Sequence, residues 1–145
     1  MASIRSRIGR NMEDRYLFKA KRLDNNYWIL GFLSVNKTGK YFIRPICGSA
    51  LSSEEVDKNT ICQCTGLKDR NGKLILENDI VAYWDTYSTE NGWAEADCIG
   101  KVVWDDETLS FQVTNRLSSE SYEVLDECSV IGNIFDNPEL LEREG

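Results

Sequence analysis

The fold class of this chain is decided most clearly by residues 98–114, which read CIGKVVWDDETLSFQVT. Two runs rich in β-branched and aromatic residues, 98–104 and 109–114, lie on either side of the polar segment 105–108. Such runs around a short polar segment are typical of two strands joined by a turn. The stretch therefore predicts an antiparallel β hairpin.

A second hairpin is predicted upstream, over residues 27–46. The runs YWILGFLSV (27–35) and YFIRPI (41–46) flank the segment NKTGK, whose Asn36 and Gly39 tolerate the positive φ that hairpin turns often require. Pro45 has no amide proton to donate to a ladder. The second strand is therefore expected to end there or to lie at a sheet edge.

The remaining sequence alternates between short apolar runs and turn residues. Strands are expected over residues 16–21, 60–65, 74–76, 122–125 and 128–135, and the segment 77–84 is expected to be a turn that leads into a strand. Asn71-Gly72 marks a tight turn, and residues 52–57 fit either a helical turn or a polar loop. The polar segment 85–97 is expected to be an exposed loop. Asn137, Pro138 and Glu139 predict the start of a brief helix.

Length and composition indicate one folded unit or two small β units that share a core. The chain has 145 residues, 41% hydrophobic and 28% charged, which is close to the globular average. No apolar run reaches the roughly 18 to 20 residues that span a bilayer, and residues 1–11 lack the apolar stretch of a secretory signal. The five cysteines are an odd number without small-scaffold spacing, as expected of reduced thiols. We therefore expect a cytosolic protein.

Charge is unevenly distributed along the chain. Residues 1–44 contain ten Lys or Arg against three Asp or Glu, although the net charge of the chain is −7. Such asymmetry is compatible with a nucleic-acid-binding segment, with surfaces that pair in self-assembly, or with chance.

Most catalytic and cofactor sites find no support in the sequence. The chain has no histidine, which excludes the usual His-based nucleophile, acid–base and metal sites. The thiols of Cys62 and Cys64, with the other cysteines, could in principle form a zinc site, but the paired two-residue spacers of zinc knuckles are missing, and small buried side chains are the simpler interpretation. No phosphate-binding glycine loop is present, and nothing singles out a carboxylate pair among the acids at 77, 79 and 105–107. We assign no catalytic residue, cofactor or metal.

A nucleic-acid-binding sheet is one functional hypothesis. Basic residues alternate with aromatic ones in the first predicted strands, and Arg15, Lys19, Lys21 and Arg22 are the candidate contacts. The competing interpretation is an ordinary half-buried sheet, whose alternation turns the aromatic rings inward and the lysines to water. We favour that second interpretation because the chain is acidic overall.

A protein-binding surface is the other hypothesis, and Trp93 is its candidate contact residue. Trp84 and Trp104 lie at predicted strand ends, where core packing would explain them. Trp93 stands in the polar segment 85–97, where packing gives no such reason, so we expect it either to be an exposed contact or to fold back as a lid.

Several segments, in order along the chain, resemble the YopX-like family of phage and prophage proteins. They are RYLFKAKR (15–22), WILGFL (28–33), QCTGLKDRNGK (63–73), ENDIV (77–81), GKVVW (100–104) and VIGNIFDNPELL (130–141). The similarity covers residues 12–141. It implies a β-rich protein that acts in the host cytoplasm, without an established activity or a catalytic residue. It also implies that Met12 is the natural start, with residues 1–11 as a disordered leader or an extension added upstream of it.

The same resemblance shapes the expected architecture. Where the family usually has Glu-Gly-Asp, this chain has Asn78 in place of the glycine, and asparagine is the usual non-glycine residue in the left-handed region. The turn, the Ile-Val pair and the Gly-x-Val-x-Trp hairpin also look like the opening of an SH3-like barrel. We therefore expect a mainly β protein, with an antiparallel β subdomain over 12–66 and a small SH3-like barrel with a short C-terminal helix over 67–145. The alternative is one compact YopX-like domain over 12–141.

Function is expected to be binding rather than catalysis. The first hypothesis is a phage or prophage accessory protein that binds a host or phage protein, with self-association into a homo-oligomer as one form of this. The alternative is a nucleic-acid-binding accessory factor that uses the basic N-terminal sheet, and the third is an unrecognised enzyme. No membrane partner is expected.

Overall fold

The computed structural model describes residues 14–46, 52–115, 121–124 and 127–142, without the side chains of 85–88 and 121–123. Strands dominate these ranges, and the C-terminal helix is short, which confirms the expected mainly β fold. The chain divides into two compact units, residues 1–66 and 67–145, which we call unit 1 and unit 2. No helix in the described ranges is long and apolar enough to cross a membrane.

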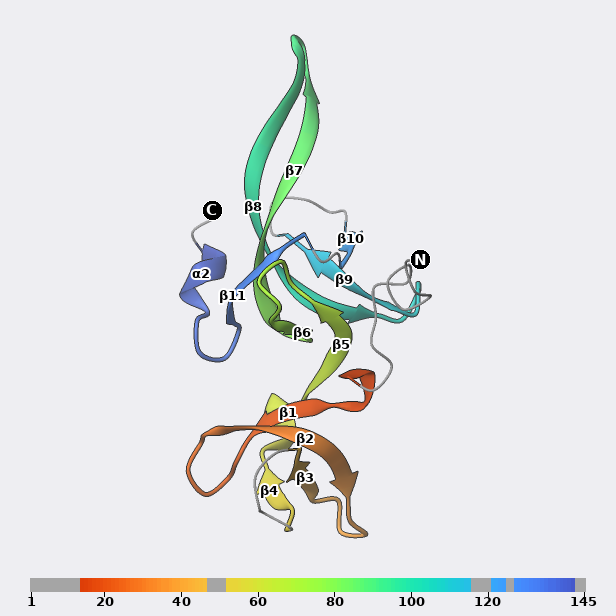
Figure 1. Cartoon of the computed structure of the whole chain (residues 1–145), viewed down its shortest axis with the longest axis vertical. Coiled ribbons are helices and arrows are strands. Elements are labelled where there is room, and N and C mark those ends of the chain that lie inside the picture. The colour runs from red at the N-terminus through yellow and green to blue at the C-terminus, as the bar shows by residue number, and fades with distance from the viewer. Residues whose placement is uncertain (1–13, 47–51, 116–120, 125–126, 143–145) are drawn as a thin grey trace. The chain divides into compact units, whose positions relative to one another are not determined.

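Unit 1 is an antiparallel sheet with the strand order β4-β3-β2-β1-β5 (Figure 1). Its elements are the 3₁₀ turn η1 (Asp14–Tyr16), β1 (Phe18–Lys21), β2 (Trp28–Val35), β3 (Tyr41–Pro45), β4 (Glu54–Val56), the 3₁₀ turn η2 (Lys58–Thr60) and β5 (Cys62–Lys68). Residues 52–57, whose sequence fits a helical turn or a polar loop, thus contain a short strand, β4. β5 crosses the boundary between the units at residue 66.

A small apolar cluster of Ala20, Ile43 and Val56 forms the core of unit 1. The strands can surround this cluster because β4 returns to the end of β1. An isolated bridge joins Arg22 to Val56, and the amide of Asp57 donates to the carbonyl of Lys21 at 2.8 Å. One face of the sheet is therefore the core side, and the other is turned away from it.

The predicted hairpin of β2 and β3 is confirmed. Asn36 Oδ1 accepts hydrogen bonds from the amides of Thr38 and Lys40, and Gly39 adopts a φ of 84°. β3 ends at Pro45, as expected of a residue without an amide proton. Opposite it, Gly31 allows a close approach of the strands, since a Cβ there would lie 1.9 Å from the carbonyl oxygen of Arg44.

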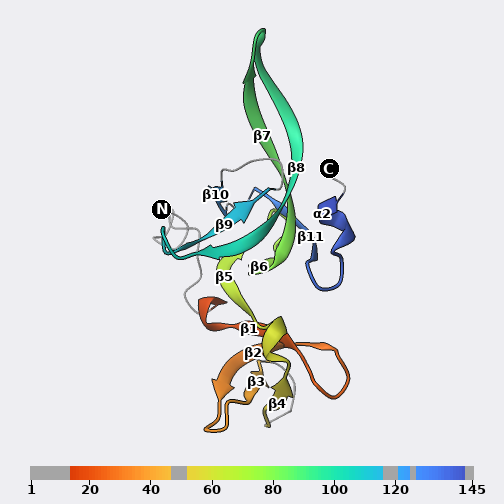
Figure 2. The ribbon, with the colours of Figure 1, turned by 180° about the vertical axis from the view of Figure 1, so that it is seen from behind.

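Unit 2 contains a second antiparallel sheet with the strand order β10-β9-β8-β7-β11 (Figure 2). Its elements are β6 (Leu74–Leu76), β7 (Asp79–Thr89), β8 (Gly92–Asp105), β9 (Ser110–Thr114), β10 (Ser121–Glu123), β11 (Ser129–Asn133) and α2 (Glu139–Glu142). β6 is the neighbour of β5, which it meets through the predicted Asn-Gly turn, where Gly72 has a φ of 82°.

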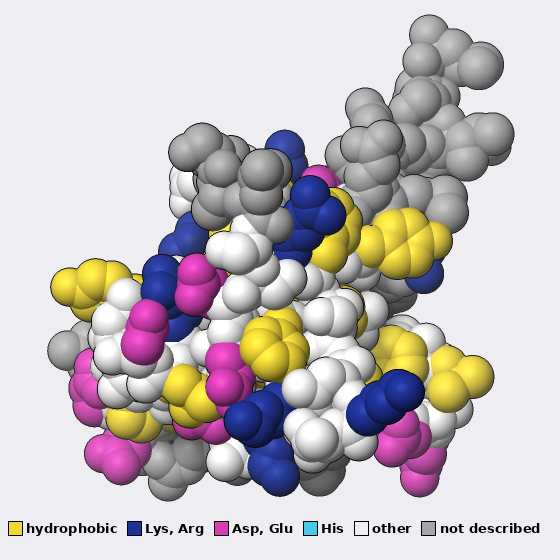
Figure 3. All heavy atoms as spheres, turned by 90° about the horizontal axis from the view of Figure 1, so that it is seen from below, with side chains coloured by type: hydrophobic (Ala, Val, Ile, Leu, Met, Phe, Trp, Pro, Cys, Tyr) yellow, Lys and Arg dark blue, Asp and Glu magenta, His cyan; other side chains and the backbone are white. Residues whose placement is uncertain are grey.

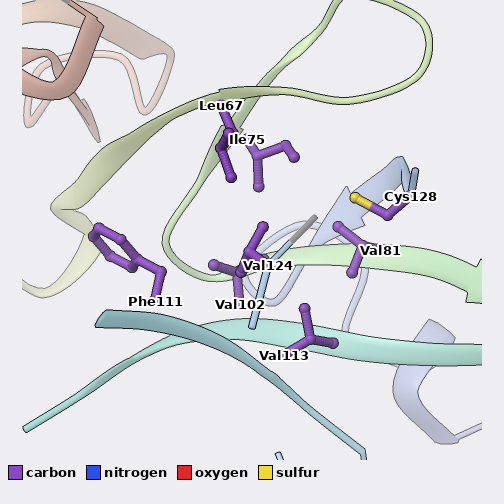
Figure 4. Packing of buried hydrophobic residues seen from close by; sticks show 8 residues of the cluster. All are labelled: Leu67, Ile75, Val81, Val102, Phe111, Val113, Val124 and Cys128. Atoms are coloured by element: carbon purple, nitrogen blue, oxygen red, sulfur yellow. The ribbon is translucent and has the colours of Figure 1, made fainter. Parts of the chain in front are cut away.

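The core of unit 2 is an apolar cluster that joins the β5–β6 hairpin to the five-stranded sheet (Figure 4). Side chains from both sides point into it, and each aliphatic or aromatic one contributes about 1.5 to 3 kcal/mol by leaving water. The cluster consists of Leu67, Ile75, Val81, Val102, Phe111, Val113, Val124 and Cys128.

The five-stranded sheet of unit 2 is open. Its edge strands β10 and β11 do not pair with each other within the described ranges. The expected SH3-like barrel is therefore not confirmed, although the hairpin of β8 and β9 predicted over residues 98–114 is present.

The predicted loop over residues 85–97 is wrong, because this segment is the end of a long β hairpin. β7 and β8 pair without interruption from Ile80↔Lys101 to Thr89↔Gly92, around a two-residue turn at Glu90 and Asn91. Gly92 has a φ of 122°, which favours glycine. Figures 1 and 2 show that the two strands run beyond the rest of unit 2 as an arm. Sequence reasoning missed it because polar residues dominate the segment, although Ala94, Ala96 and Cys98 alternate with Glu95 and Asp97 as in a strand with one half-buried face.

Candidate functional site

The acid in the most distinctive motif, Asp69, has a structural role. Its side chain accepts hydrogen bonds from three backbone amides, those of Asn71 and Lys73 at 2.9 Å and that of Val130 at 2.8 Å. Burial opposes ionisation of this carboxyl, but these amides outweigh burial and lower its pKa below the usual value. Asp69 therefore shapes its own turn and ties it to β11.

The other motif residues also serve turns. Asp79 is buried and accepts from the amide of Leu76 at 2.8 Å, and the predicted left-handed conformation of Asn78 is confirmed by a φ of 72°. Asn133 Oδ1 accepts from the amides of Phe135 and Asp136, both at 2.9 Å. Asn137, at the predicted start of the helix, uses its side-chain oxygen to accept from the amide of Asn133 at 3.2 Å. These polar residues are thus hydrogen-bonded to backbone.

The remaining candidates for chemistry are not brought together. Asp105 accepts from the amide of Glu107, and Asp106 accepts from the indole of Trp104 at 2.8 Å, so these hairpin acids have local partners. Cys62 and Cys64 are buried, as expected of small side chains in a core. The described residues contain no group of three or more potential metal ligands, and Cys47 lies outside them.

The face of unit 1 turned away from the core carries basic and aromatic side chains, and we call it the outer face. Strand register defines its members, because directly paired residues share a face. They are Lys19, Lys21, Trp28, Leu30, Phe32, Ser34, Phe42, Arg44, Glu55 and, opposite Lys19, the buried Cys62.

At the centre of the outer face, two ammonium groups lie over one indole. The Nζ atom of Lys19 is 4.5 Å from the ring centroid of Trp28, and that of Lys21 is 5.3 Å from it. The expectation that aromatic rings turn inward is confirmed for Phe18 and Tyr41, which pack against the core cluster. It is wrong for Trp28, which stands on the lysine side of the sheet.

The other two predicted nucleic-acid contacts do not join this cluster. The guanidinium of Arg22 pairs with Asp24 at 2.6 Å and with Glu54 at 3.3 Å. Its hydrogen bond to Asp24 lowers the pKa of that carboxyl. Arg15 is exposed within η1, where its carbonyl accepts from the side-chain amide of Gln63. Of the four predicted contacts, the structure therefore groups only Lys19 and Lys21.

Unit 2 presents a second surface on its arm, which we define as residues 84–89 and 92–97 and call the ribbon. Trp93 is 78% exposed, so the structure places it as a surface residue and not as a folded-back lid. Trp84, 60% exposed, is on the same face, because it pairs with Asp97, four residues along β8 from Trp93. The two indoles are thus set about 13 Å apart along the strand.

Core packing was expected to explain Trp84 and Trp104, and this is wrong for Trp84. Trp104 is 43% exposed and packs edge-on against Phe111, with ring centroids 5.1 Å apart. No sequence pattern distinguishes the two tryptophans, because both end apolar runs. The difference in exposure between the two tryptophans depends on how far β7 and β8 continue beyond the strands that pair with them.

The edges of the ribbon have no third strand beside them within the described ranges. β11 pairs with β7 only over residues 79–82, and β9 pairs with β8 only over residues 101–105. Rows of backbone donors and acceptors along an edge of this kind are a template for pairing with another chain.

Similarity to known proteins extends over both units. The family model of the YopX protein matches residues 24–142. The chain belongs to the YopX family. Residues 84–97 fall within the match, whereas Lys19 and Lys21 precede it.

One solved structure similar to this YopX family chain is the crystal structure of protein EF1440 from Enterococcus faecalis. The two chains are 25% identical, with a TM-score of 0.50, and the similarity covers 86% of this chain and 96% of the other. The comparison with curated proteins found no match. The fold and the family are thereby shown.

Proposed function

We propose that this YopX family protein acts by binding another protein through the ribbon and does not catalyse a reaction. As the family resemblance implies, its setting is the cytoplasm of a host that carries the phage or prophage. The observation that carries the proposal is the ribbon itself, an arm with two open edges and two exposed tryptophans on one face.

The open edges support binding by strand addition. A partner strand placed beside residues 84–89 or 92–97 would pair with backbone groups that have no neighbouring strand in the described structure. Backbone hydrogen bonds supply affinity in this mode, and side chains on alternate positions supply selectivity. An isolated two-stranded ribbon is marginally stable in water, so a third strand would also stabilise the arm.

The tryptophans support a specific contact. A tryptophan buries a large apolar area and is frequent among the residues that dominate binding energies. Trp84 and Trp93 flank Glu95 on one face of the ribbon, so a partner would need apolar recesses about 13 Å apart with a polar group between them.

Charge indicates what kind of protein fits. Residues 83–99 contain no Lys or Arg, whereas Asp85, Glu90, Glu95 and Asp97 are acidic. Two ribbons laid edge to edge would bring like charges together, which disfavours that form of the expected homo-oligomer at low salt. The charge favours a partner with a basic surface, and light scattering at low and high salt would measure self-association separately.

A photo-crosslinking experiment tests the proposal. The photoreactive amino acid p-benzoylphenylalanine replaces Trp93 in the full chain, and the protein is irradiated in the cells that produce it. The matched control carries the same group at Leu109, which is 72% exposed on the β8–β9 turn. We expect a discrete protein adduct from position 93 that is absent from position 109. Equal labelling at both positions, or no adduct at 93, would overturn the proposal.

A further inference from the structure

We propose that the outer face of unit 1 is a binding site for single-stranded nucleic acid, in which Lys19, Lys21 and Arg44 contact phosphates and Phe32 stacks on a base. This site is separate from the ribbon and does not depend on the function proposed for it. The observation behind the proposal is the register that gathers basic and aromatic side chains on one side of β1, β2 and β3.

The outer face is positively charged within an acidic chain. Among its members, Lys19, Lys21 and Arg44 are basic and only Glu55 is acidic, although the chain carries a net charge of −7. Figure 3 shows dark blue basic side chains among magenta acidic and yellow apolar ones on the surface of the molecule seen from below. A local excess of this kind selects for an anionic ligand.

The lysines are gathered by an aromatic ring. Trp28 lies directly opposite Lys21 in the ladder, and both ammonium groups lie within 5.3 Å of its ring centroid. A cation–π contact holds two like charges close together at a modest cost, because the ring face attracts both. The result is a site of two adjacent positive charges, which suits the phosphates of one strand.

A second aromatic ring lies next to this charge. Phe32 is 52% exposed, which is unusual for a phenylalanine with a core available in the same unit, and it lies on β2 four residues from Trp28. Arg44 is exposed and directly opposite Phe32 in the β2–β3 ladder. An accessible ring with a guanidinium beside it is the arrangement on which an unpaired base stacks while its phosphate is neutralised.

The aromatic component favours a nucleic acid over an acidic protein. Carboxylate-rich segments would use the positive charges but have no need of exposed rings, whereas each base offers a flat face for stacking. Duplexes hide those faces within the helix, so a single strand is the better ligand. The large exposed apolar area of Phe32 is then explained by its ligand.

The test measures binding of a fluorescein-labelled dT20 oligonucleotide to the full chain by fluorescence anisotropy, from low to high salt. With three cations in contact with phosphate, the slope of log K against log salt should be about −2, and about −0.7 for the Lys19→Ala/Lys21→Ala variant. The control Lys68→Ala/Lys73→Ala removes the same charge from exposed positions elsewhere and should leave the slope unchanged.

Stacking is tested by two further measurements. Phe32→Ala should weaken binding by about tenfold or more without changing the salt slope. An abasic oligonucleotide of equal length and charge should bind more weakly than dT20 by a similar factor. Thermal unfolding of each variant verifies that unit 1 is folded.

Three outcomes would overturn the proposal. The first is no anisotropy change at low salt. The second is equal binding of dT20 and the abasic strand. The third is displacement of dT20 by poly-L-glutamate at equal charge concentration, which would identify the face as a site for acidic protein. None of these bears on crosslinking at the ribbon.

Discussion

Replacement of Asp69 tests whether the most distinctive motif of the chain is structural. The carboxylate accepts one hydrogen bond at Oδ2, from Val130, and two at Oδ1, from Asn71 and Lys73. Each bond contributes on the order of 1 to 1.5 kcal/mol. Asp69→Ala removes all three, so we expect a loss of about 3 to 4 kcal/mol.

The Asp69→Asn variant distinguishes the contributions of the two carboxylate oxygens of Asp69. An asparagine can keep its oxygen toward Asn71 and Lys73, but its amide group then meets the N–H of Val130, donor against donor. We expect it to lose about half as much free energy of unfolding as Asp69→Ala, on the order of 2 kcal/mol.

Thermal unfolding followed by circular dichroism measures the difference. A loss of 1 kcal/mol in the free energy of unfolding lowers Tm by about 4 to 8 °C for a unit of this size. The Tm of the Asp69→Ala variant should therefore be lower than that of the parent by at least about 12 °C. Asp106→Ala, an acid at the exposed β8–β9 turn, is the control and should change Tm little. A decrease in Tm of less than about 2 °C for Asp69→Ala would show that these three bonds do not hold the turn. An Asp69→Asn variant as stable as the parent would show the same.

The same turns and ladders lead to three more expected outcomes. Because the pKa of Asp69 is lowered by folding, its contribution is complete above the unfolded pKa of about 3.9 and is lost as pH falls through the folded value. The Tm difference between the parent and Asp69→Ala should therefore shrink from about pH 5 toward about pH 2, and a constant difference would count against this. Asn78→Val should cost about 1 to 2 kcal/mol in urea unfolding because its φ is 72°, while Asn78→Gly should be tolerated; equal effects would exclude a backbone cause. Gly31→Ala places a Cβ against the carbonyl of Arg44 and should cost about 1 to 3 kcal/mol, and an unchanged Tm would show that the β2–β3 spacing adapts.

The local backbone geometry could be predicted from the sequence. The Asn36–Gly39 loop, the end of β3 at Pro45, the turn at Gly72 and the left-handed Asn78 follow from residues whose own backbone preferences select the conformation. The β8–β9 hairpin follows from alternation over two neighbouring runs. Such features depend on contacts between residues close together in the chain.

The candidate binding surfaces depended on tertiary structure. Alternation placed Lys19 and Lys21 on one side of a strand, but only the ladder to β2 put Trp28 on that same side. Arg22 instead pairs with Glu54 of β4. Trp93 could be singled out from its polar surroundings, whereas Trp84 looked like a core residue. Its exposure follows from the length of β7 beyond β11, which no local pattern records.

The hairpin over residues 98–114, the mainly β character of the chain and the positions of its turns are all legible in the amino-acid order, because backbone preference and side-chain alternation are local properties. Long-range pairing was needed to establish that the sheet of unit 2 stays open, that its longest hairpin extends as a ribbon, and which face of each strand is covered. A strand pattern specifies two faces and two edges, but the neighbours that cover them come from distant parts of the chain.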